Sequence, residues 1–218
     1  MTLDHSITQN VLISVEGGTV GAFLSIPKRA SKLVIFVHGS GSSRHSTRNQ
    51  SVARELNHVG IATLLADLLT AEEEEFDKMT AHIRFDIDFL TERTLALHDW
   101  AKSNQETSKF RKAFFGASTG AAAALQAAAK LPSEIYAVVS RGGRPDLAGK
   151  DLNLVHAPTL FIIGGLDTEV LAFNQEAFAQ LRCMKQLEVV EGAMHLFEEP
   201  GTLEQVSKLA VQWFFKHS

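Results

Sequence analysis

The chain has 218 residues, of which 45% are hydrophobic and 21% charged, so it can bury one core but is short for two independent domains. We therefore expect a single domain over residues 1–218. The formal net charge of −4 provides no broad attraction for nucleic acid or an anionic membrane, and no apolar run approaches the roughly 20 residues of a membrane span. We therefore expect neither nucleic acid nor a membrane as a partner.

The cysteine content and the start of the chain bear on its location. Cys183 is the one cysteine, so no internal disulfide can form. The segment Met1–His5 lacks the basic-then-apolar order of a secretory signal. We therefore expect a cytoplasmic protein.

The first half of the chain changes from a hairpin to alternating strands and helices. Apolar segments on both sides of Gly17 and Gly18 predict an antiparallel hairpin. The near-continuous apolar run that follows is typical of a strand covered on both faces. The predicted elements are hairpin strands 11–15 and 20–26, strand 32–37, helix 48–59 ending at Gly60, strand 61–66 and helix 86–103.

The second half repeats this alternation. Its predicted elements are strands 112–115, 136–140, 159–165 and 186–190, an alanine-rich helix up to Leu131, and a last helix 202–217. This order predicts an α/β fold with a mostly parallel sheet, helices on both faces and the hairpin as an antiparallel edge. The acidic run Glu72–Glu75 indicates a solvated loop or a helix start, and we expect no metal site there.

The motif G-x-S-x-G occurs once in a context that gives it a mechanism. It centres on Ser118 and lies between an apolar strand and the alanine-rich helix. A sharp strand-to-helix turn would strain the serine backbone, and the small residues Gly116, Ala117 and Gly120 would prevent clashes. The alternative is that Ser118 only caps the helix.

A serine nucleophile needs a base and a carboxylate, and both follow in the chain. Asp167 comes just after strand 159–165, and His195 comes after strand 186–190. The order Ser, Asp, His is the one that accompanies this motif. Asp67, at the end of an earlier strand, is an alternative carboxylate.

Two backbone N–H groups are candidates for an oxyanion hole. One belongs to Thr119, directly after the nucleophile, and the other to Ser40, in the loop after strand 32–37. His38 precedes this loop, and we expect a structural role for it. Arg44 stands where a dinucleotide-binding fingerprint requires a third glycine, so the loop does not predict a nucleotide site.

With these motifs in place, the chain resembles the dienelactone hydrolase-related members of the α/β-hydrolase superfamily over nearly its whole length. The marks are the segments 38–44, 116–120, 140–146, 165–167 and 195–197. The resemblance implies hydrolysis of small esters or lactones without a metal or organic cofactor. The strand-to-helix turn that carries the nucleophile is called the elbow. Dienelactone hydrolases proper have a cysteine at the elbow, whereas this chain has Ser118 there and carries its cysteine, Cys183, in an unrelated segment. That difference favours a general serine esterase.

Arg141 and Arg144 follow a strand expected beside that of the nucleophile. Their guanidinium groups can bind an anionic group of the substrate, or form structural ion pairs with Asp146 or Asp151.

The segments between strands are too short for a separate lid domain, the longest being about 68–84, so we expect an open site for small soluble substrates. The alternative is a homo-oligomer in which a second subunit covers the site. An acyltransferase using the same triad and a non-catalytic binding module are the alternative functions.

Overall fold

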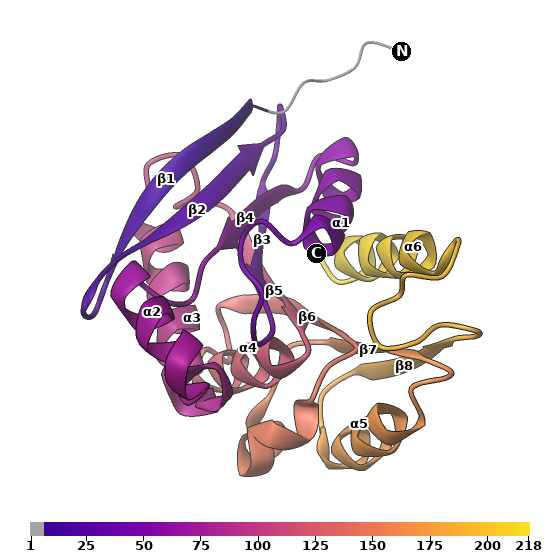
Figure 1. The fold of residues 1–218 in the computed structure, drawn as a ribbon. Coiled ribbons are helices and arrows are strands. Elements are labelled where there is room, and N and C mark those ends of the chain that lie inside the picture. Colours follow the sequence, from indigo (N-terminus) through magenta and orange to yellow (C-terminus); the bar gives the residue numbers. More distant parts are fainter. Residues whose placement is uncertain (1–6) are drawn as a thin grey trace.

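A computed structural model describes residues 7–218, and the segment Met1–His5 used for the localisation prediction lies outside them. Eight strands form one sheet in the order β1-β2-β4-β3-β5-β6-β7-β8 (Figure 1). The strands are β1 Ile7–Val15, β2 Gly18–Ile26, β3 Lys32–Val37, β4 Ala62–Ala66, β5 Arg111–Ala117, β6 Ile135–Arg141, β7 Thr159–Gly164 and β8 Lys185–Val190. β1 and β2 pair antiparallel at one edge, β2 pairs antiparallel with β4, and every other neighbouring pair is parallel.

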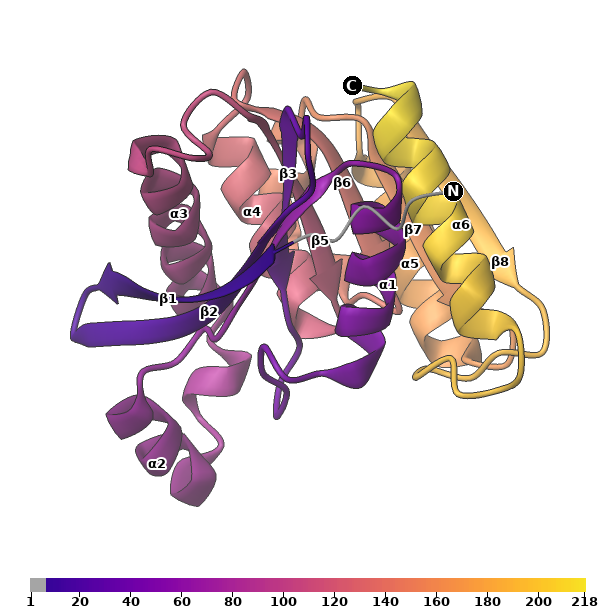
Figure 2. The ribbon, with the colours of Figure 1, turned by 90° about the horizontal axis from the view of Figure 1, so that it is seen from above.

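Helices cover both faces of the sheet (Figure 2). They are α1 Thr47–His58, α2 Ala71–Thr80, α3 Ile87–Ser103, α4 Thr119–Lys130, α5 Thr168–Gln180 and α6 Thr202–Lys216, with 3₁₀ segments η1 Ile83–Phe85 and η2 Pro145–Leu154. The predicted α/β-hydrolase fold is confirmed. Neither α5 nor the 3₁₀ segments were singled out from the sequence.

The alternation of side chains along β3 explains why its sequence is apolar throughout. Leu33 and Ile35 belong to the core beneath α3, α4 and α5, whereas Val34 and Phe36 belong to the core beneath α1 and α6. A strand that is covered on both faces needs an apolar residue at every position. β3 therefore lies at the centre of the molecule and positions the loop that follows it.

The acidic run Glu72–Glu75 lies at the start of α2. Of the two predicted alternatives, a solvated loop or a helix start, the helix start is confirmed. Thr70 and Glu73 form a reciprocal capping box at the start of α2, the T-x-x-E pattern that satisfies two free N–H groups. Asp77 then accepts hydrogen bonds from the N–H groups of Ile83 and Arg84 and pairs with the Arg84 side chain at 2.6 Å. These contacts fix α2 to η1, and Figure 2 shows α2 projecting from the body of the fold.

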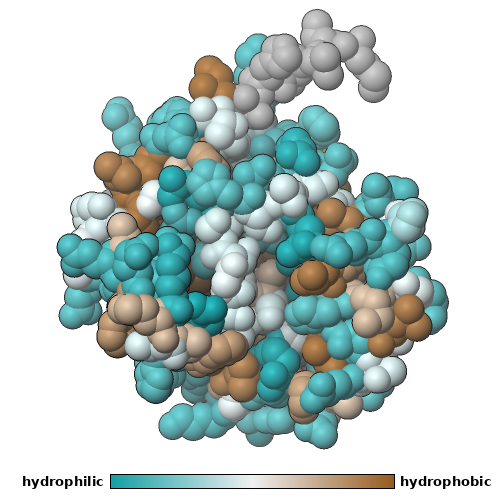
Figure 3. Space-filling view, in the orientation of Figure 1, coloured by the Kyte–Doolittle hydropathy of each residue, from teal (hydrophilic) through white to brown (hydrophobic). Residues whose placement is uncertain are grey.

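Within residues 7–218, no helix has both the length and the apolar composition that crossing a bilayer requires. On the face shown in Figure 3, hydrophilic atoms predominate and hydrophobic atoms gather in separate patches. This face has no single continuous apolar surface of the kind that marks a large buried interface.

Candidate active site

The three residues predicted as a triad follow three parallel strands at the same edge of the sheet. Ser118 follows β5, Asp167 comes shortly after β7, and His195 comes after β8. Because the carboxyl ends of parallel strands meet at one edge, the loops carrying these residues are neighbours. This edge is the candidate active site.

Ser118 sits in the strained turn that the motif predicts. Its backbone has φ 51° and ψ −127°, a conformation in the left-handed half of the map that non-glycine residues rarely adopt. It precedes the first residue of α4, but its side chain makes no capping hydrogen bond. The alternative interpretation of Ser118 as a capping residue is therefore wrong, and within residues 7–218 its hydroxyl is left without a hydrogen-bond partner.

Two glycines allow the elbow to pack against the end of β3. A Cβ at Gly120 would overlap the carbonyl oxygens of Val37 and His38. A Cβ at Gly39 would lie 2.7 Å from the Cβ of Ser118, closer than real Cβ atoms approach. The loop after β3 is thus pressed directly against the serine.

His195 and Asp167 are joined by a hydrogen bond. Nδ1 of His195 lies 2.7 Å from Oδ2 of Asp167. Asp167 stands at the N-cap position of α5, yet its carboxylate caps nothing and is directed to the imidazole instead. The histidine side chain is 36% exposed and that of Asp167 16%, so solvent reaches the ring more easily than the carboxylate.

The alternative carboxylate, Asp67, has a different partner. It accepts a hydrogen bond of 2.8 Å from the N–H of Arg44 and forms an ion pair with the Arg44 guanidinium. None of its described contacts is with His195. The structure thus assigns the carboxylate partner of His195 to Asp167.

His38 has the environment of a structural residue. Its Nε2 accepts the N–H of Leu68 at 3.2 Å, which leaves Nδ1 as the donor to the carbonyl of Gly39 at 2.9 Å. Burial lowers the pKa of His38 below its usual value, although the bond to Gly39 opposes this. A neutral ring with both nitrogens occupied ties the loop after β3 to the segment after β4.

The two predicted oxyanion donors, the N–H groups of Ser40 and Thr119, belong to neighbouring residues, and the N–H of Ser40 already donates a hydrogen bond. Thr119 is the first residue of α4, so its N–H has no acceptor within the helix. The N–H of Ser40 donates to Oγ1 of Thr119 at 3.0 Å. A substrate oxygen that binds the Ser40 N–H must therefore share it with the threonine hydroxyl or displace that hydroxyl.

The loop after β6 lies against the elbow, as predicted. The N–H of Ser118 donates to the carbonyl of Arg141 at 3.4 Å, and the N–H of Arg144 donates to the carbonyl of Ser118 at 3.0 Å. The Arg144 side chain is occupied by two hydrogen bonds to Asp146, at 2.9 and 2.7 Å, and it stacks over Phe173. Of the two alternatives for Arg144, the geometry is that of the ion pair with Asp146.

The Arg141 side chain has different surroundings from that of Arg144. The Arg141 side chain is enclosed, with the residue only 7% exposed, and among residues 7–218 its Nε and Nη1 find no hydrogen-bond partner. Burial lowers the pKa of Arg141 to about 10, and the nearby positive charge of Arg48 contributes.

Two positioning residues were missed in the sequence. Gly142 has φ 48°, and a Cβ there would lie 3.0 Å from the carbonyl oxygen of His195 and 3.4 Å from the Phe197 ring. Phe197 is itself buried at φ 56°. The glycine pair after β6 was the available signal, because a close approach to the histidine loop needs a residue without a side chain.

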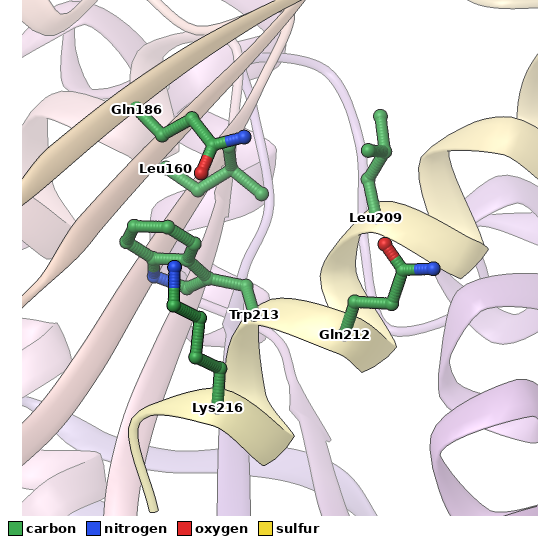
Figure 4. Close-up of a pocket in the computed structure, with 6 residues that line it drawn as sticks. All are labelled: Leu160, Gln186, Leu209, Gln212, Trp213 and Lys216. Carbon is green, nitrogen blue, oxygen red and sulfur yellow. The ribbon is translucent and has the colours of Figure 1, made fainter.

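A groove elsewhere on the molecule is separate from this edge. It has a volume of about 220 Å³ and lies between α6 and the starts of β7 and β8 (Figure 4). Its lining residues are Leu160, Gln186, Leu209, Gln212, Trp213 and Lys216. Leu160 and Gln186 each stand second in their strands, so the groove is at the opposite end of the strands from Asp167 and His195.

The sheet order and the elbow define the class of protein: an α/β-hydrolase fold with its candidate site at the carboxyl edge. The sequence profile of the dienelactone hydrolase family matches residues 20–213, so the chain belongs to that family, which places it among hydrolases.

Two solved structures share this fold. The structure of a dienelactone hydrolase from Anabaena variabilis has a TM-score of 0.95 and 50% sequence identity, covering 97% of this chain and 98% of that one. Est1E from Butyrivibrio proteoclasticus superimposes with a TM-score of 0.77 at 18% identity, covering 95% of this chain and 98% of the other, which shows a shared fold alone.

A longer relative carries a different name. A protein of Mycobacterium tuberculosis strain H37Rv, provisionally named a phosphoribosyl transferase, is 53% identical over 198 residues, or 91% of this chain. The matched region is 44% of that protein, so this chain spans less than half the length of that relative.

Proposed function

We propose that the chain hydrolyses small carboxylic esters or lactones through an acyl-enzyme on Ser118. In this proposal His195 is the general base and acid, and Asp167 orients the imidazole. The observation that carries it is the 2.7 Å bond between Asp167 and His195 at the same sheet edge as a strained serine with a free hydroxyl.

The proposed reaction has two halves. The Ser118 oxygen attacks the acyl carbon while Nε2 of His195 takes its proton, and the imidazolium then returns that proton to the departing alcohol. Water attacks the acyl-enzyme in the second half, again losing a proton to His195, and the carboxylic acid leaves as Ser118 regains its hydrogen. Asp167 stabilises the imidazolium in both halves because its carboxylate accepts the Nδ1 proton.

The oxyanion formed in each half needs donors placed beforehand. We assign the N–H of Thr119 and the N–H of Ser40 to this role. Supporting evidence is that both stand beside the elbow, joined through the Thr119 hydroxyl at 3.0 Å from the Ser40 nitrogen.

The names of the relatives bear on the substrate. The name of the Anabaena protein suggests lactones, and the serine in place of the cysteine of dienelactone hydrolases proper favours ordinary esters. The name of the Mycobacterium protein describes a chain more than twice as long, so a phosphoribosyl transfer is not part of this proposal.

The proposal is tested by steady-state hydrolysis of a series of 4-nitrophenyl esters of increasing acyl length. Ser118→Ala should abolish turnover above background without a loss of fold, because it removes one hydroxyl and little packing. Ser42→Ala is the matched control, since its hydroxyl makes no hydrogen bond within residues 7–218. Retention of more than about a tenth of the wild-type rate by Ser118→Ala would refute the nucleophile assignment.

A product analysis separates hydrolysis from acyl transfer. Water and an acceptor alcohol compete for the same acyl-enzyme, so the ratio of acid to new ester is measured with and without added alcohol. A hydrolase yields mainly the acid at moderate alcohol concentration.

A further inference from the structure

The loop 142–144, which joins β6 to η2, lies between the proposed nucleophile and the proposed base. On one side, the N–H of Arg144 donates to the carbonyl of Ser118 at 3.0 Å. On the other side, a Cβ at Gly142 would lie 3.0 Å from the carbonyl oxygen of His195 and 3.6 Å from its Nδ1. A shift of this loop would therefore move the serine backbone or press on the histidine.

The loop is tied to the helix that follows the proposed acid. Asn174 stands on α5, whose N-cap is Asp167, and its Nδ2 donates to the carbonyl of Gly143 at 2.8 Å. Nδ2 also donates at 2.7 Å to the carbonyl of Val170, one turn earlier in α5. Because both partners are carbonyl oxygens, only the NH2 group of the amide can face them. α5 also packs against η2, which directly follows the loop (Figure 1). Asn174 thus joins the helix that begins after Asp167 to the loop beside the serine and the histidine.

The Asn174 side chain is enclosed and only partly satisfied. The residue is 0% exposed, and its Oδ1 is buried without a donor among residues 7–218. Burying an amide oxygen without a hydrogen bond costs free energy, which offsets part of the gain from the two bonds that Nδ2 donates. An apolar side chain of similar size would fill the same space without that cost. The presence of an amide here is therefore better explained by what the bond to Gly143 does for the loop than by packing.

We propose that Asn174 is a positioning residue, which holds loop 142–144 so that Ser118 and His195 keep the alignment needed for proton transfer. Its described hydrogen bonds are to backbone carbonyls, so it acts through the loop and not on the substrate. A base must lie within hydrogen-bond reach of the proton it takes, and a displacement near 1 Å can cost about 100-fold in rate. This inference deepens the proposed function and rests on it for the roles of Ser118 and His195.

The kinetic test replaces Asn174 by leucine, which has a similar size and no donor. With a 4-nitrophenyl ester, Asn174→Leu should lower kcat at least about tenfold and change KM less than about threefold, because the reacting groups are misaligned while the open site is kept. Asn57→Leu is the matched control, since Nδ2 of Asn57 also donates twice, to the carbonyl of Ile61 and to Oγ1 of Thr63 at the start of β4. It should lower the melting temperature and leave kcat near wild type. A kcat for Asn174→Leu near that of the wild type, or an equal fall in Asn57→Leu, would overturn the proposal.

A second variant, Asn174→Ser, covers the case in which leucine disturbs the core. A serine hydroxyl can still bond to the carbonyl one turn back in the helix, as the Thr91 hydroxyl does to Ile87 at 2.8 Å, but it is too short to reach Gly143. Asn174→Ser should therefore keep α5 intact, lose the link to the loop and show the same fall in kcat with KM nearly unchanged. A wild-type kcat in folded Asn174→Ser would overturn the proposal.

A proton NMR measurement keeps this inference separate from the proposed mechanism. The proton between Nδ1 of His195 and Asp167 is strongly hydrogen bonded, so it should give a far-downfield signal, which is identified by its loss in Asp167→Asn. The signal is recorded without substrate in Ser118→Ala, where it should shift or broaden on adding Asn174→Ser and stay unchanged on adding Asn57→Leu. This result would support the positioning of His195 by Asn174 even if Ser118 proved not to be the nucleophile. An unchanged signal on adding Asn174→Ser would overturn the inference and leave the mechanism standing.

Discussion

Nδ1 of His195 lies 2.7 Å from Oδ2 of Asp167, a hydrogen bond between segments that follow the last two strands of the sheet. The bond holds the imidazole in one orientation and fixes the proton on Nδ1, so that Nε2 faces away from the carboxylate. This is the relationship that the proposed mechanism requires of a base and its orienting acid.

Replacing the carboxylate of Asp167 should lower activity and leave the fold intact. Asp167→Asn should reduce kcat by roughly three to four orders of magnitude, because the amide no longer holds the correct tautomer or stabilises the imidazolium. Steady-state kinetics with a 4-nitrophenyl ester measure this.

Asp67→Asn is the control for this change, since Asp67 pairs with Arg44. We expect it to lower thermal stability more than kcat. Larger kinetic damage from Asp67→Asn than from Asp167→Asn would mean that the carboxylate had been assigned wrongly.

The close packing of the loop after β3 on the elbow makes Gly39 sensitive to substitution. In Gly39→Ala, the new Cβ would begin 2.7 Å from the Cβ of Ser118, so the loop or the serine must move. A displacement near 1 Å at a reacting group can cost about 100-fold in rate, and we expect kcat to fall at least tenfold with the fold retained. Ser42→Ala in the same loop is the control and should be near wild type.

Asp77 gives a prediction for stability against pH. Burial opposes its ionisation, but hydrogen bonds from Arg84 and Ile83 outweigh this and hold the pKa of the carboxyl below its usual value. Ionised Asp77 therefore stabilises the fold above its unfolded pKa, and this contribution is lost as the pH falls through the folded pKa.

Asp77→Asn should accordingly lower the free energy of unfolding by about 2 kcal/mol at neutral pH and by progressively less in acid. Urea denaturation at several pH values measures the difference. A difference that stays constant with pH would show that the charge of Asp77 is not what stabilises the contact between α2 and η1.

Local patterns were sufficient to predict the sheet and the positions of the proposed triad. The motif around Ser118 combines a strand, a turn of small residues and a helix within one short segment, so sequence alone carries the geometry. Asp167 and His195 could be predicted because each stands after an apolar run whose end is marked by glycines.

Side-chain partners could not be predicted in the same way. The sequence allowed Arg144 to bind a ligand or Asp146, and only the first turn of η2 brings Asp146 into two-pronged contact with the Arg144 guanidinium. Whether Arg141 faces solvent or the core depends on the register of β6, because one residue of slip reverses the side chain. The occupied N–H of Ser40 depends on Thr119, which is 79 positions away in the chain.

Labelling with a fluorophosphonate tests the central claim most directly, because such probes react covalently with activated serines. The labelled protein is digested, the modified residue is located by mass spectrometry, and the remaining esterase activity is recorded in parallel. We predict one adduct, on Ser118, with activity lost in proportion to labelling and no adduct in Ser118→Ala. An adduct on a different serine, or loss of activity while Ser118 stays unmodified, would contradict it.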